Sequence, residues 1–262
     1  MGYEYETIRY ESDGRGLARL TLNRPEAMNG MTNVMVREAA EALERAATDV
    51  SVRVLALTGA GRAFCPGADL NHFTSGQADQ KLTVEEFRAA SLLHDMPAVT
   101  VAAINGACAG AGLGWAMACD LRLMAAGARL NTAFLDVAVA GDMGLPWSLA
   151  RAVGSARARD LSLLPRRVSA DEAAQIGLVA RVFPDDRFAE MTEEVLASLL
   201  SKSPTALLAL KANYLAAERM SFAEFVGHEA GRHLEIASSE DTAEAFRAFI
   251  DKRQPDFPSL RH

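Results

Sequence analysis

The N-terminal part of the chain alternates apolar and polar residues with a period of two. This alternation covers Tyr3–Arg9 and Leu17–Leu22, and the segment Ser12–Gly14 between them has the composition of a turn. A period of two is typical of strands with one buried face. We therefore predict an antiparallel hairpin and place it at the edge of a sheet.

Beyond the hairpin, the apolar positions change to the spacing of a helix. Thr32 can cap a helix whose apolar face carries Val36, Ala39, Ala40, Leu43 and Ala47. Val54–Leu57 then predicts a buried strand. This order of helix and strand predicts a crossover unit.

The same order returns once more along the chain. Thr83 precedes a helical pattern with Phe87, Leu92 and Leu93, which Pro97 ends, and Val99–Ile104 is apolar throughout. A continuous apolar run is typical of a parallel strand buried on both faces. Leu121–Met124 predicts another strand after a short, glycine-led helix. Strands that alternate with helices predict a mainly parallel α/β core.

From Ser155 onward, helical patterns rich in Ala, Leu and Glu dominate, and only Leu178–Phe183 still resembles a strand. Helices are predicted after five capping residues, namely Ser169, Asp185, Ser203, Ser221 and Ser239. Short amphipathic helices must bury their apolar faces on something. We therefore expect the C-terminal third to be an annex of the core or an oligomer surface.

Composition and charge exclude several classes of protein. The 262 residues are 50% hydrophobic, which supports a sizeable core, and the net charge is −7 with no basic run longer than Arg166-Arg167. Met1–Tyr10 lacks the pattern of a signal peptide, and no run of about 18 apolar residues occurs. We therefore expect a soluble, cytoplasmic protein with neither nucleic acid nor a membrane as partner.

The cysteines do not form a recognisable framework. Cys65, Cys108 and Cys119 are odd in number and irregularly spaced, which fits neither a disulfide framework nor a metal-binding knuckle. We expect them to be small buried side chains, and we expect no metal site.

Two glycine-rich loops follow predicted strands, where α/β proteins bind ligands. They are Gly59–Leu70 and Asn105–Gly114. A dinucleotide fingerprint that starts at Gly110 fails because its sixth position is Trp115, and no P-loop motif occurs. Unobstructed amides at a helix start can bind a developing oxyanion. Alternatively, the glycines only allow a helix to pack tightly on the sheet, and the residues alone leave both interpretations open.

A set of motifs resembles the crotonase (enoyl-CoA hydratase/isomerase) superfamily in order and spacing along the whole chain. The matching segments are Leu22–Pro25, Leu57–Gly59, Phe64–Leu70, Ala103–Gly106, Ala116–Asp120, Gly177–Val179 and Phe249–Arg253. The resemblance implies a ββα superhelical α/β core over residues 1–200 with the acyl-CoA site. It also implies a helical trimerisation region over residues 201–262, assembly as a trimer or hexamer, and a coenzyme A thioester as substrate without a further cofactor.

The resemblance also implies the site. The amides of Ala68 and Ala111 match the pair that holds the thioester oxygen, although Ala111 stands where glycine is usual. Six positions match residues that line coenzyme A: Arg24, Ala63, Pro66, Ala68, Asp69 and Leu70. Phe249 and Lys252 match C-terminal residues that reach the adenine end from a neighbouring subunit.

The residues that decide the reaction depart from the hydratase pattern. Hydration of an enoyl-CoA uses two glutamates in this family, and the matching positions are Gly114 and Phe134, neither of which can ionise. We therefore expect weak or absent hydratase activity. One acid remains, because Asp142 matches a catalytic aspartate of several family isomerases and the nucleophile of 4-chlorobenzoyl-CoA dehalogenases.

The main hypothesis assigns a proton shuttle to Asp142. Its apolar and glycine neighbours should raise the pKa of its carboxyl, which suits a base that moves a proton between two carbons of an unsaturated acyl-CoA. Alternatively, Asp142 caps the helix that begins near Leu145–Trp147. Other functions left open are an enoyl-CoA hydratase of fatty-acid β-oxidation, a dehalogenase-like enzyme and a non-catalytic acyl-CoA binder.

Other side chains carry weaker signals. A dehalogenase would need a histidine that we cannot place, since His72 and His94 are typical of surface or packing residues. Asp136 either approaches the pocket or lies exposed, and Asp69 is expected to stabilise its own turn. Apolar residues that belong either to an acyl pocket or to the core are Met28, Met31, Met96, Met117, Phe73, Phe87, Trp115 and Trp147.

Overall fold

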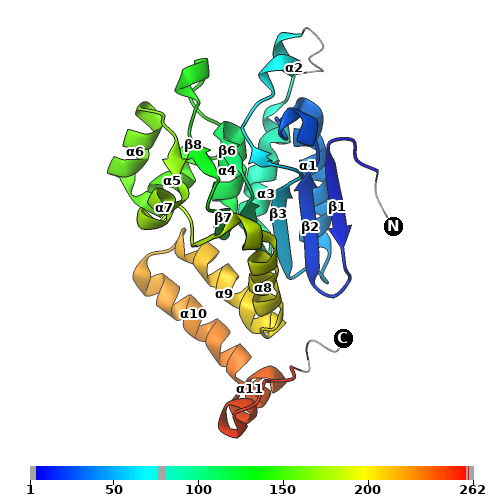
Figure 1. Cartoon of the computed structure of the whole chain (residues 1–262). Coiled ribbons are helices and arrows are strands. Elements are labelled where there is room, and N and C mark those ends of the chain that lie inside the picture. Colours follow the sequence, from blue (N-terminus) through cyan, green and yellow to red (C-terminus); the bar gives the residue numbers. More distant parts are fainter. Residues whose placement is uncertain (1–3, 76–80, 258, 260–262) are drawn as a thin grey trace.

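The computed structural model describes residues 4–75, 81–257 and 259, so that Tyr3 of the predicted hairpin lies outside the described residues. Within these ranges, six strands form the larger of two sheets (Figure 1). Their order across the sheet is β1 (Ile8–Ser12), β2 (Leu17–Leu22), β3 (Val54–Gly59), β5 (Val99–Ile104), β7 (Leu121–Ala125) and β10 (Arg181–Phe183). Within this sheet, only β1 and β2 pair antiparallel, and the other neighbouring strands described are parallel. The predicted edge hairpin and the mainly parallel α/β core are therefore confirmed.

Two strand boundaries differ from the prediction. β1 starts at Ile8 because the carboxylate of Glu38 accepts the amides of Glu6 and Thr7, at 2.6 and 2.8 Å. β10 starts at Arg181 because Leu178 is engaged elsewhere, its carbonyl accepting from the Arg122 guanidinium at 2.7 Å. In both places, side-chain hydrogen bonds from distant elements engage the backbone next to the strand.

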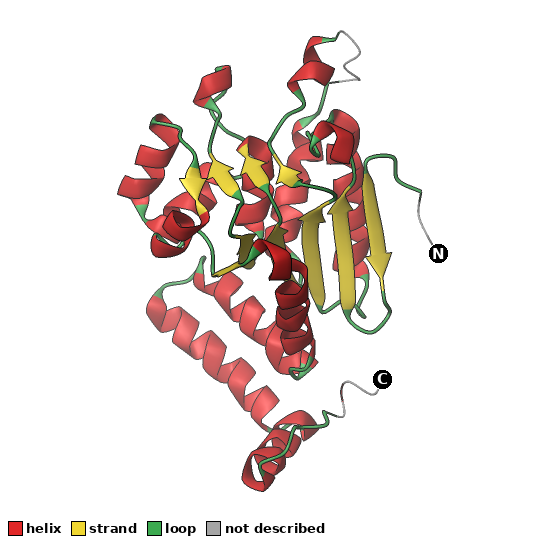
Figure 2. Ribbon diagram, in the orientation of Figure 1, coloured by secondary structure: helices red, strands yellow, loops and turns green. Residues whose placement is uncertain are grey.

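The described chain also forms a smaller, four-stranded sheet, which sequence patterns did not predict (Figure 2). It consists of β4 (Ala63–Cys65), β6 (Ala107–Ala109), β8 (Arg129–Asn131) and β9 (Val168–Ser169). Strands of two or three residues are too short to display alternation. β4 and β6 lie inside the two glycine-rich loops, so these loops are held by a sheet of their own.

The helices mostly begin where capping residues predicted. The α-helices are α1 (Asn33–Thr48), α2 (Leu70–Thr74), α3 (Ala89–Asp95), α4 (Gly110–Ala118), α5 (Leu145–Val153), α6 (Ser155–Leu163), α7 (Ala170–Gln175), α8 (Phe188–Leu200), α9 (Pro204–Ala217), α10 (Phe222–Ala237) and α11 (Glu240–Asp251). Short 3₁₀ helices are η1 (Pro25–Ala27), η2 (Val84–Arg88), η3 (Leu135–Val137) and η4 (Asp185–Arg187). The helices predicted from Thr83 and Asp185 thus both begin as a 3₁₀ turn, and α3 and α8 continue them.

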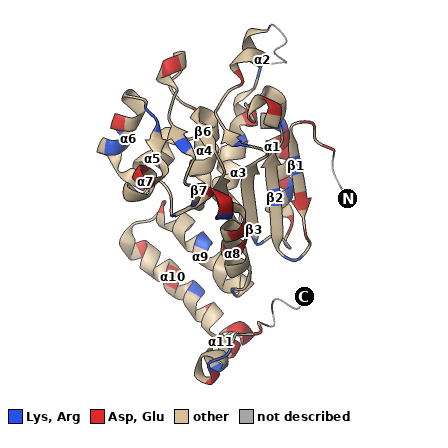
Figure 3. Ribbon diagram, viewed as in Figure 1, with Lys and Arg blue, Asp and Glu red and all other residues tan. Residues whose placement is uncertain are grey.

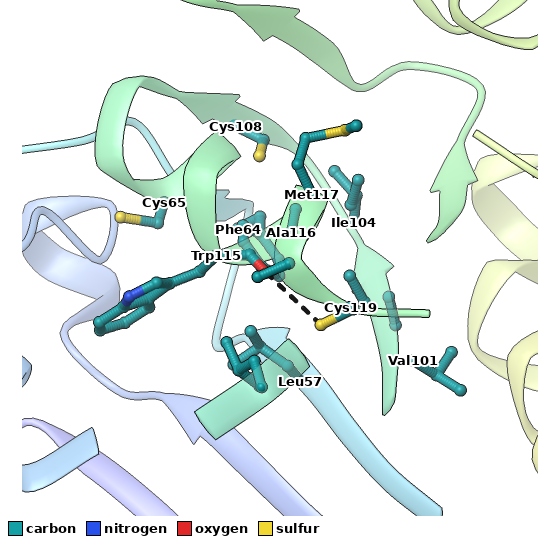
Figure 4. Close-up of a cluster of buried hydrophobic side chains, with 14 of the residues drawn as sticks. Leu57, Phe64, Cys65, Val101, Ile104, Cys108, Trp115, Ala116, Met117 and Cys119 are labelled. Carbon is teal, nitrogen blue, oxygen red and sulfur yellow. Dashed lines mark hydrogen bonds between the residues drawn. The ribbon is translucent and has the colours of Figure 1, made fainter. Parts of the chain in front are cut away.

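The central helix α4 is buried on every side, and the three cysteines surround it (Figure 4). Trp115 is 1% exposed and Cys119 donates to its carbonyl. Cys65, Cys108 and Cys119 are buried and unpaired, as predicted. Burial raises the pKa of the Cys65 and Cys119 thiols to about 12, so these side chains pack rather than react.

The C-terminal helices differ in how they contact the core. Lys211 of α9 is buried, and its ammonium donates to the carbonyl of Ala98 at 2.7 Å and pairs with Asp120 at 2.8 Å. α10 and α11 instead extend away from the sheets (Figure 1). The predicted boundary between residues 200 and 201 falls in the turn between α8 and α9.

Charged residues of both signs are scattered along the ribbon (Figure 3). No single helix in the described ranges is long and apolar enough to cross a membrane. The segments Asp185–Leu200 and Pro204–Ala217 pass that test of length and composition only as a pair, bent by 100°.

Candidate functional site

A cavity of about 390 Å³, called the inner cavity below, brings three predicted site residues together. Its lining residues among those described are Met31, Thr32, Asn33, Val36, Ala68, Phe73, Lys81, Leu82, Phe87, Ala111, Asp142 and Met143. Ala68, Ala111 and Asp142 come from three separate segments of the chain. Their convergence shows that one ligand could meet all three.

The loop that carries Ala68 is fastened to the chain before α1. Met31 donates its amide to the carbonyl of Gly67 at 2.8 Å, and the amide of Asp69 donates to the carbonyl of Met31 at 3.0 Å. This short parallel bridge uses the carbonyl of Gly67 and the amide of Asp69, on either side of Ala68, but not the amide of Ala68 itself. The Ala68 amide is therefore held in place, and it has no acceptor among the described residues.

Arg24 and Asp69 brace the same loop. The Arg24 guanidinium pairs with the Asp69 carboxylate at 2.9 Å and also donates to the carbonyl of Gly30 at 2.5 Å. The other carboxylate oxygen of Asp69 caps α2 by accepting the amide of His72 at 3.1 Å. Burial would raise the pKa of Asp69, but the hydrogen bonds from His72 and Arg24 outweigh it and lower the pKa. The predicted role of Asp69 in its turn is confirmed.

Ala111 is the second residue of α4, and the first amides of a helix have no intrahelical acceptor. The glycines around it permit a very close contact between the two loops. A Cβ on Gly112 would lie 2.3 Å from the carbonyl oxygen of Cys65, and one on Gly67 would lie 3.2 Å from that of Ala109. Tight packing by Gly67 and Gly112 is therefore confirmed and sets the position of the Ala111 amide, while the binding of an oxyanion by this amide stays a prediction.

Asp142 supplies the one carboxyl group among the described lining residues of the inner cavity. The side chain is partly buried, and its buried Oδ1 has no hydrogen-bond partner in the described part of the chain. Burial raises the pKa of Asp142 to about 6. The carboxyl is therefore charged at neutral pH but lacks the donors that usually stabilise a carboxylate.

The alternative that Asp142 caps α5 is wrong. The N-cap of α5 is Gly144 at φ +69°, and no side chain in the described part of the chain accepts a hydrogen bond from the first amides of the helix. The amide of Leu145 donates to the backbone carbonyl of Asp142 at 3.0 Å, not to its carboxylate. A glycine in the left-handed region begins this helix instead, and the Asp142 side chain turns to the cavity.

Neither position that matches a hydratase glutamate supplies a carboxyl group. Position 114 also lacks the space for a side chain. A Cβ on Gly114 would lie 2.6 Å from the Cβ of Met143, so Met143 occupies the space that a side chain at position 114 would need. Phe134 is partly buried, and one edge of its ring faces Gly110. Asp136 is exposed on η3 and does not line the inner cavity.

Other residues predicted to line coenzyme A are spread more widely. Ala63 is 1% exposed in β4, so its side chain has no free surface, whereas Leu70 is 54% exposed at the start of α2. Pro66 is partly buried between them. Phe249 is 86% exposed, and Lys252 ends α11, which lies at the opposite end of the molecule from α2 (Figure 1).

Sequence patterns found only part of the cavity lining. Of the apolar candidates, Met31, Phe73 and Phe87 line the inner cavity, whereas Met96 and Trp115 are buried in the core. The lining residues that no pattern had singled out as pocket residues are Thr32, Asn33, Val36, Lys81, Leu82 and Met143. Only their convergence in space identifies them. No group of acidic, histidine and cysteine side chains suited to a metal ion occurs in the described residues.

Comparisons with known proteins identify the family of the chain. The family model for enoyl-CoA hydratase/isomerase matches residues 12–260. A relative from Rhodobacter capsulatus, named a probable enoyl-CoA hydratase, is 36% identical over 97% of this chain and 98% of its own. The 1,2-epoxyphenylacetyl-CoA isomerase of Escherichia coli is 33% identical over 93% of this chain and 95% of its own.

A solved structure agrees as well. The enoyl-CoA hydratase of Bacillus anthracis superposes with a TM-score of 0.87 at 26% identity, covering 97% of this chain and all of that one. The match therefore extends over both sheets and the C-terminal helices. The chain belongs to the enoyl-CoA hydratase/isomerase family of the crotonase superfamily.

Proposed function

We propose that the protein moves a double bond along the acyl group of an unsaturated acyl-CoA, with Asp142 as the proton shuttle. One observation supports this above all. The carboxyl of Asp142, whose Oδ1 has no hydrogen-bond partner among the described residues, lines the same cavity as Ala68 and Ala111, whose amides could hold a thioester oxygen. A base and an oxyanion site facing one ligand are the parts that enolate chemistry needs.

The reaction needs no co-reactant. The amides of Ala68 and Ala111 donate to the thioester oxygen and stabilise the negative charge that develops there. The Asp142 carboxylate removes a proton from one carbon, and the electron pair delocalises into the enolate. The protonated Asp142 then returns the proton to the other end of the conjugated system. A pKa of about 6 suits both halves of this exchange, because the carboxyl can accept and release the proton near neutral pH.

Addition of water is disfavoured by the shape of the site. Hydration needs carboxylates that hold and deprotonate a water molecule, and Met143 fills the space beside Gly114 where one of them would stand. The thioether of Met143 is a weak acceptor and cannot ionise. The names of the relatives include both a probable hydratase and an isomerase and do not decide between the two reactions. The packing of Met143 against Gly114 favours the isomerase.

Dehalogenation is less well supported. That chemistry would need a histidine near the nucleophilic aspartate, and none of the described residues lining the inner cavity is a histidine. His94 instead packs edge-on against Trp147 and hydrogen-bonds Glu218 at 3.0 Å. His72 lies on α2 with its ring edge against Phe73.

We further propose that the C-terminal helices assemble a trimer. Large apolar side chains on α10 and α11 are exposed, and they include Phe222, Val226, Leu234, Phe246, Phe249 and Ile250. Apolar surface of this extent is typical of an interface. Since α11 lies far from α2 in its own chain, Phe249 and Lys252 could meet coenzyme A only at another subunit's site.

The test replaces Asp142 with Asn and uses Asp136→Asn as the matched control, because Asp136 is exposed nearby and outside the inner cavity. Both variants and the unmodified enzyme are given a panel of enoyl- and dienoyl-CoA thioesters, and the products are separated by chromatography. We expect isomer formation to fall about 10³-fold in Asp142→Asn and to persist in Asp136→Asn. Equal turnover in the two variants would sink the proposal.

A non-catalytic binder would give another result. It would bind these thioesters with unchanged affinity in all three proteins, as measured by calorimetry, and would convert none of them. That outcome also rejects the shuttle.

A further inference from the structure

A second cavity, called the outer cavity below, lies beside the inner one and has a volume of about 570 Å³. It is lined by Phe87, Ala90, Ser91, His94, Asp95, Ala118, Met143, Gly144, Trp147, Ser148, Arg151, Glu218 and Arg219. Phe87 and Met143 line both cavities, so their side chains form the partition between the two. The outer cavity therefore adjoins the inner one at Met143, the residue that follows Asp142 in the chain.

Of the five ionisable side chains that line the outer cavity, all but one contact another ionisable side chain among the described residues. His94 hydrogen-bonds Glu218 at 3.0 Å, and Arg219 pairs with Asp95 at 3.2 Å. The fifth group, Arg151, lies over the Trp147 ring with its guanidinium carbon 3.5 Å from the ring centroid.

Within the part of the chain that the structure describes, Arg151 forms no ion pair, and its guanidinium donates to the carbonyl of Trp147 at 3.3 Å. Stacking on an aromatic ring fixes the plane of a guanidinium and leaves the donors at its edge available. Arg151 is thus a positioned cation without an anionic partner.

We propose that the outer cavity binds the distal end of the acyl group and that this end is a carboxylate, held by Arg151. The inference rests on the proposed function, since it names the substrate class of the same site. The thioester end would lie at Ala68 and Ala111, the reacting carbons beside Asp142, and the far carboxylate against the edge of the Arg151 guanidinium. A planar guanidinium binds a carboxylate through two parallel hydrogen bonds, which a methyl end cannot accept.

The partition can open for such a chain. Methionine is unbranched and adapts its shape readily, so the Met143 side chain can move while its backbone stays in place. Phe87 is only partly buried and lies in the 3₁₀ helix η2 rather than in a sheet. A slender methylene chain passing between these side chains would make apolar contacts on both sides.

The experiment compares two saturated, unreactive thioesters of equal chain length, hexanoyl-CoA and hexanedioyl-CoA, which differ only in the distal carboxylate. Their affinities are measured by calorimetry for the unmodified protein, for Arg151→Gln and for the matched control Arg219→Gln. The variant Arg219→Gln removes the same charge from the same cavity. It serves as the control because Arg219 already pairs with Asp95.

We expect the unmodified protein to bind the dicarboxylic ester about fivefold more tightly, as for a partly exposed ion pair. The preference should disappear in Arg151→Gln and persist in Arg219→Gln. Equal binding of both esters by the unmodified protein would overturn the inference, and so would a preference that survives in Arg151→Gln. Tighter binding of a phenyl-terminated ester than of either would overturn it in favour of an aromatic end.

Binding of unreactive esters separates this inference from the proposed function. A carboxylate preference that depends on Arg151, together with no isomerisation of any unsaturated ester, would reject the shuttle and keep the distal site. Isomerisation without a carboxylate preference would keep the shuttle and reject the distal site.

Discussion

The two walls of the inner cavity are built in opposite ways. The amide wall, formed by residues 66–69 and the start of α4, is fixed by backbone hydrogen bonds, by the pair of Arg24 and Asp69 and by glycines that allow close packing. The acid wall, residues 138–144, presents a carboxyl oxygen without a hydrogen-bond partner among the described residues, next to Met143 at φ +49°. The amide wall is braced by hydrogen bonds and an ion pair around its two free amides, whereas the acid wall gives its carboxyl group no such bracing among the described residues.

This difference corresponds to two tasks. Donors that stabilise a developing charge act best when they are already in position before the reaction. A base must instead give up few stabilising hydrogen bonds when it takes up a proton, and a carboxylate that lacks donors fulfils that condition. Substitutions in the amide wall should therefore disturb geometry, and substitutions in the acid wall should change protonation.

The largest effect should follow from disturbing the close packing of the amide wall. In Gly112→Ala the new Cβ would approach the carbonyl oxygen of Cys65 to 2.3 Å, so the start of α4 has to move. We expect kcat to fall about 100-fold through displacement of the Ala111 amide, and the free energy of unfolding to fall by about 3 kcal/mol. Steady-state kinetics and urea denaturation measure the two effects.

Gly144→Ala serves as the control on the acid side. Gly144 has φ +69° but nothing within 4 Å of an added Cβ, so only backbone strain is introduced. The free energy of unfolding should fall by about 1 kcal/mol. If both alanine variants lose the same stability and activity, close packing does not set the position of the amide wall.

A smaller effect should follow from breaking the ion pair that braces the Ala68 loop. In Arg24→Gln the carboxylate of Asp69 loses its charged partner, and we expect kcat to fall about tenfold with little change in KM. Steady-state kinetics separates the two constants. A rise in KM at unchanged kcat would instead assign Arg24 to coenzyme A, as its sequence motif alone predicted.

The ionisation of Asp142 in the acid wall should determine how kcat/KM depends on pH. Asp142 must be ionised to accept a proton, and its pKa is raised to about 6. Between pH 7 and pH 5, kcat/KM should therefore fall about tenfold. A profile that stays flat down to pH 4 would show that the base is a different group or that its pKa is not raised.

The smallest effect concerns stability and has the opposite sign from activity. Burial raises the pKa of Asp142 in the folded protein above its usual value near 4, so the stability linked to this group is present below pH 4 and lost as pH rises through about 6. At pH 7, Asp142→Asn should therefore be more stable by about 1 kcal/mol, after allowance for solvent screening. The difference should vanish at pH 4, as thermal unfolding at the two pH values can show.

Sequence patterns predicted the elements that are long enough to show a period. The edge hairpin, α1 and the central parallel strands are examples, because their apolar residues alternate, recur at helical spacing or run on over four or more positions. The small sheet was missed because β4, β6, β8 and β9 contain two or three residues each. Its formation depends on partners from distant parts of the chain.

For the site, the motifs predicted the residues but not their surroundings. Ala68, Ala111 and Asp142 were placed by resemblance, and the structure adds that they share one cavity. The role of Met143 could not be predicted, because it follows from the distance between two segments, 2.6 Å from Met143 Cβ to a Cβ on Gly114. Likewise, only the fold shows that Gly144, not Asp142, begins α5.

The most direct test of the shuttle is the mass of the product formed in D₂O. The enzyme is incubated in D₂O with an unsaturated acyl-CoA, and the product is analysed by mass spectrometry. Transfer of a proton by Asp142 predicts an isomer of the substrate that carries no added oxygen and gains at most one deuterium per turnover. A product heavier by one whole molecule of D₂O would contradict this account, because it would show that the site adds water.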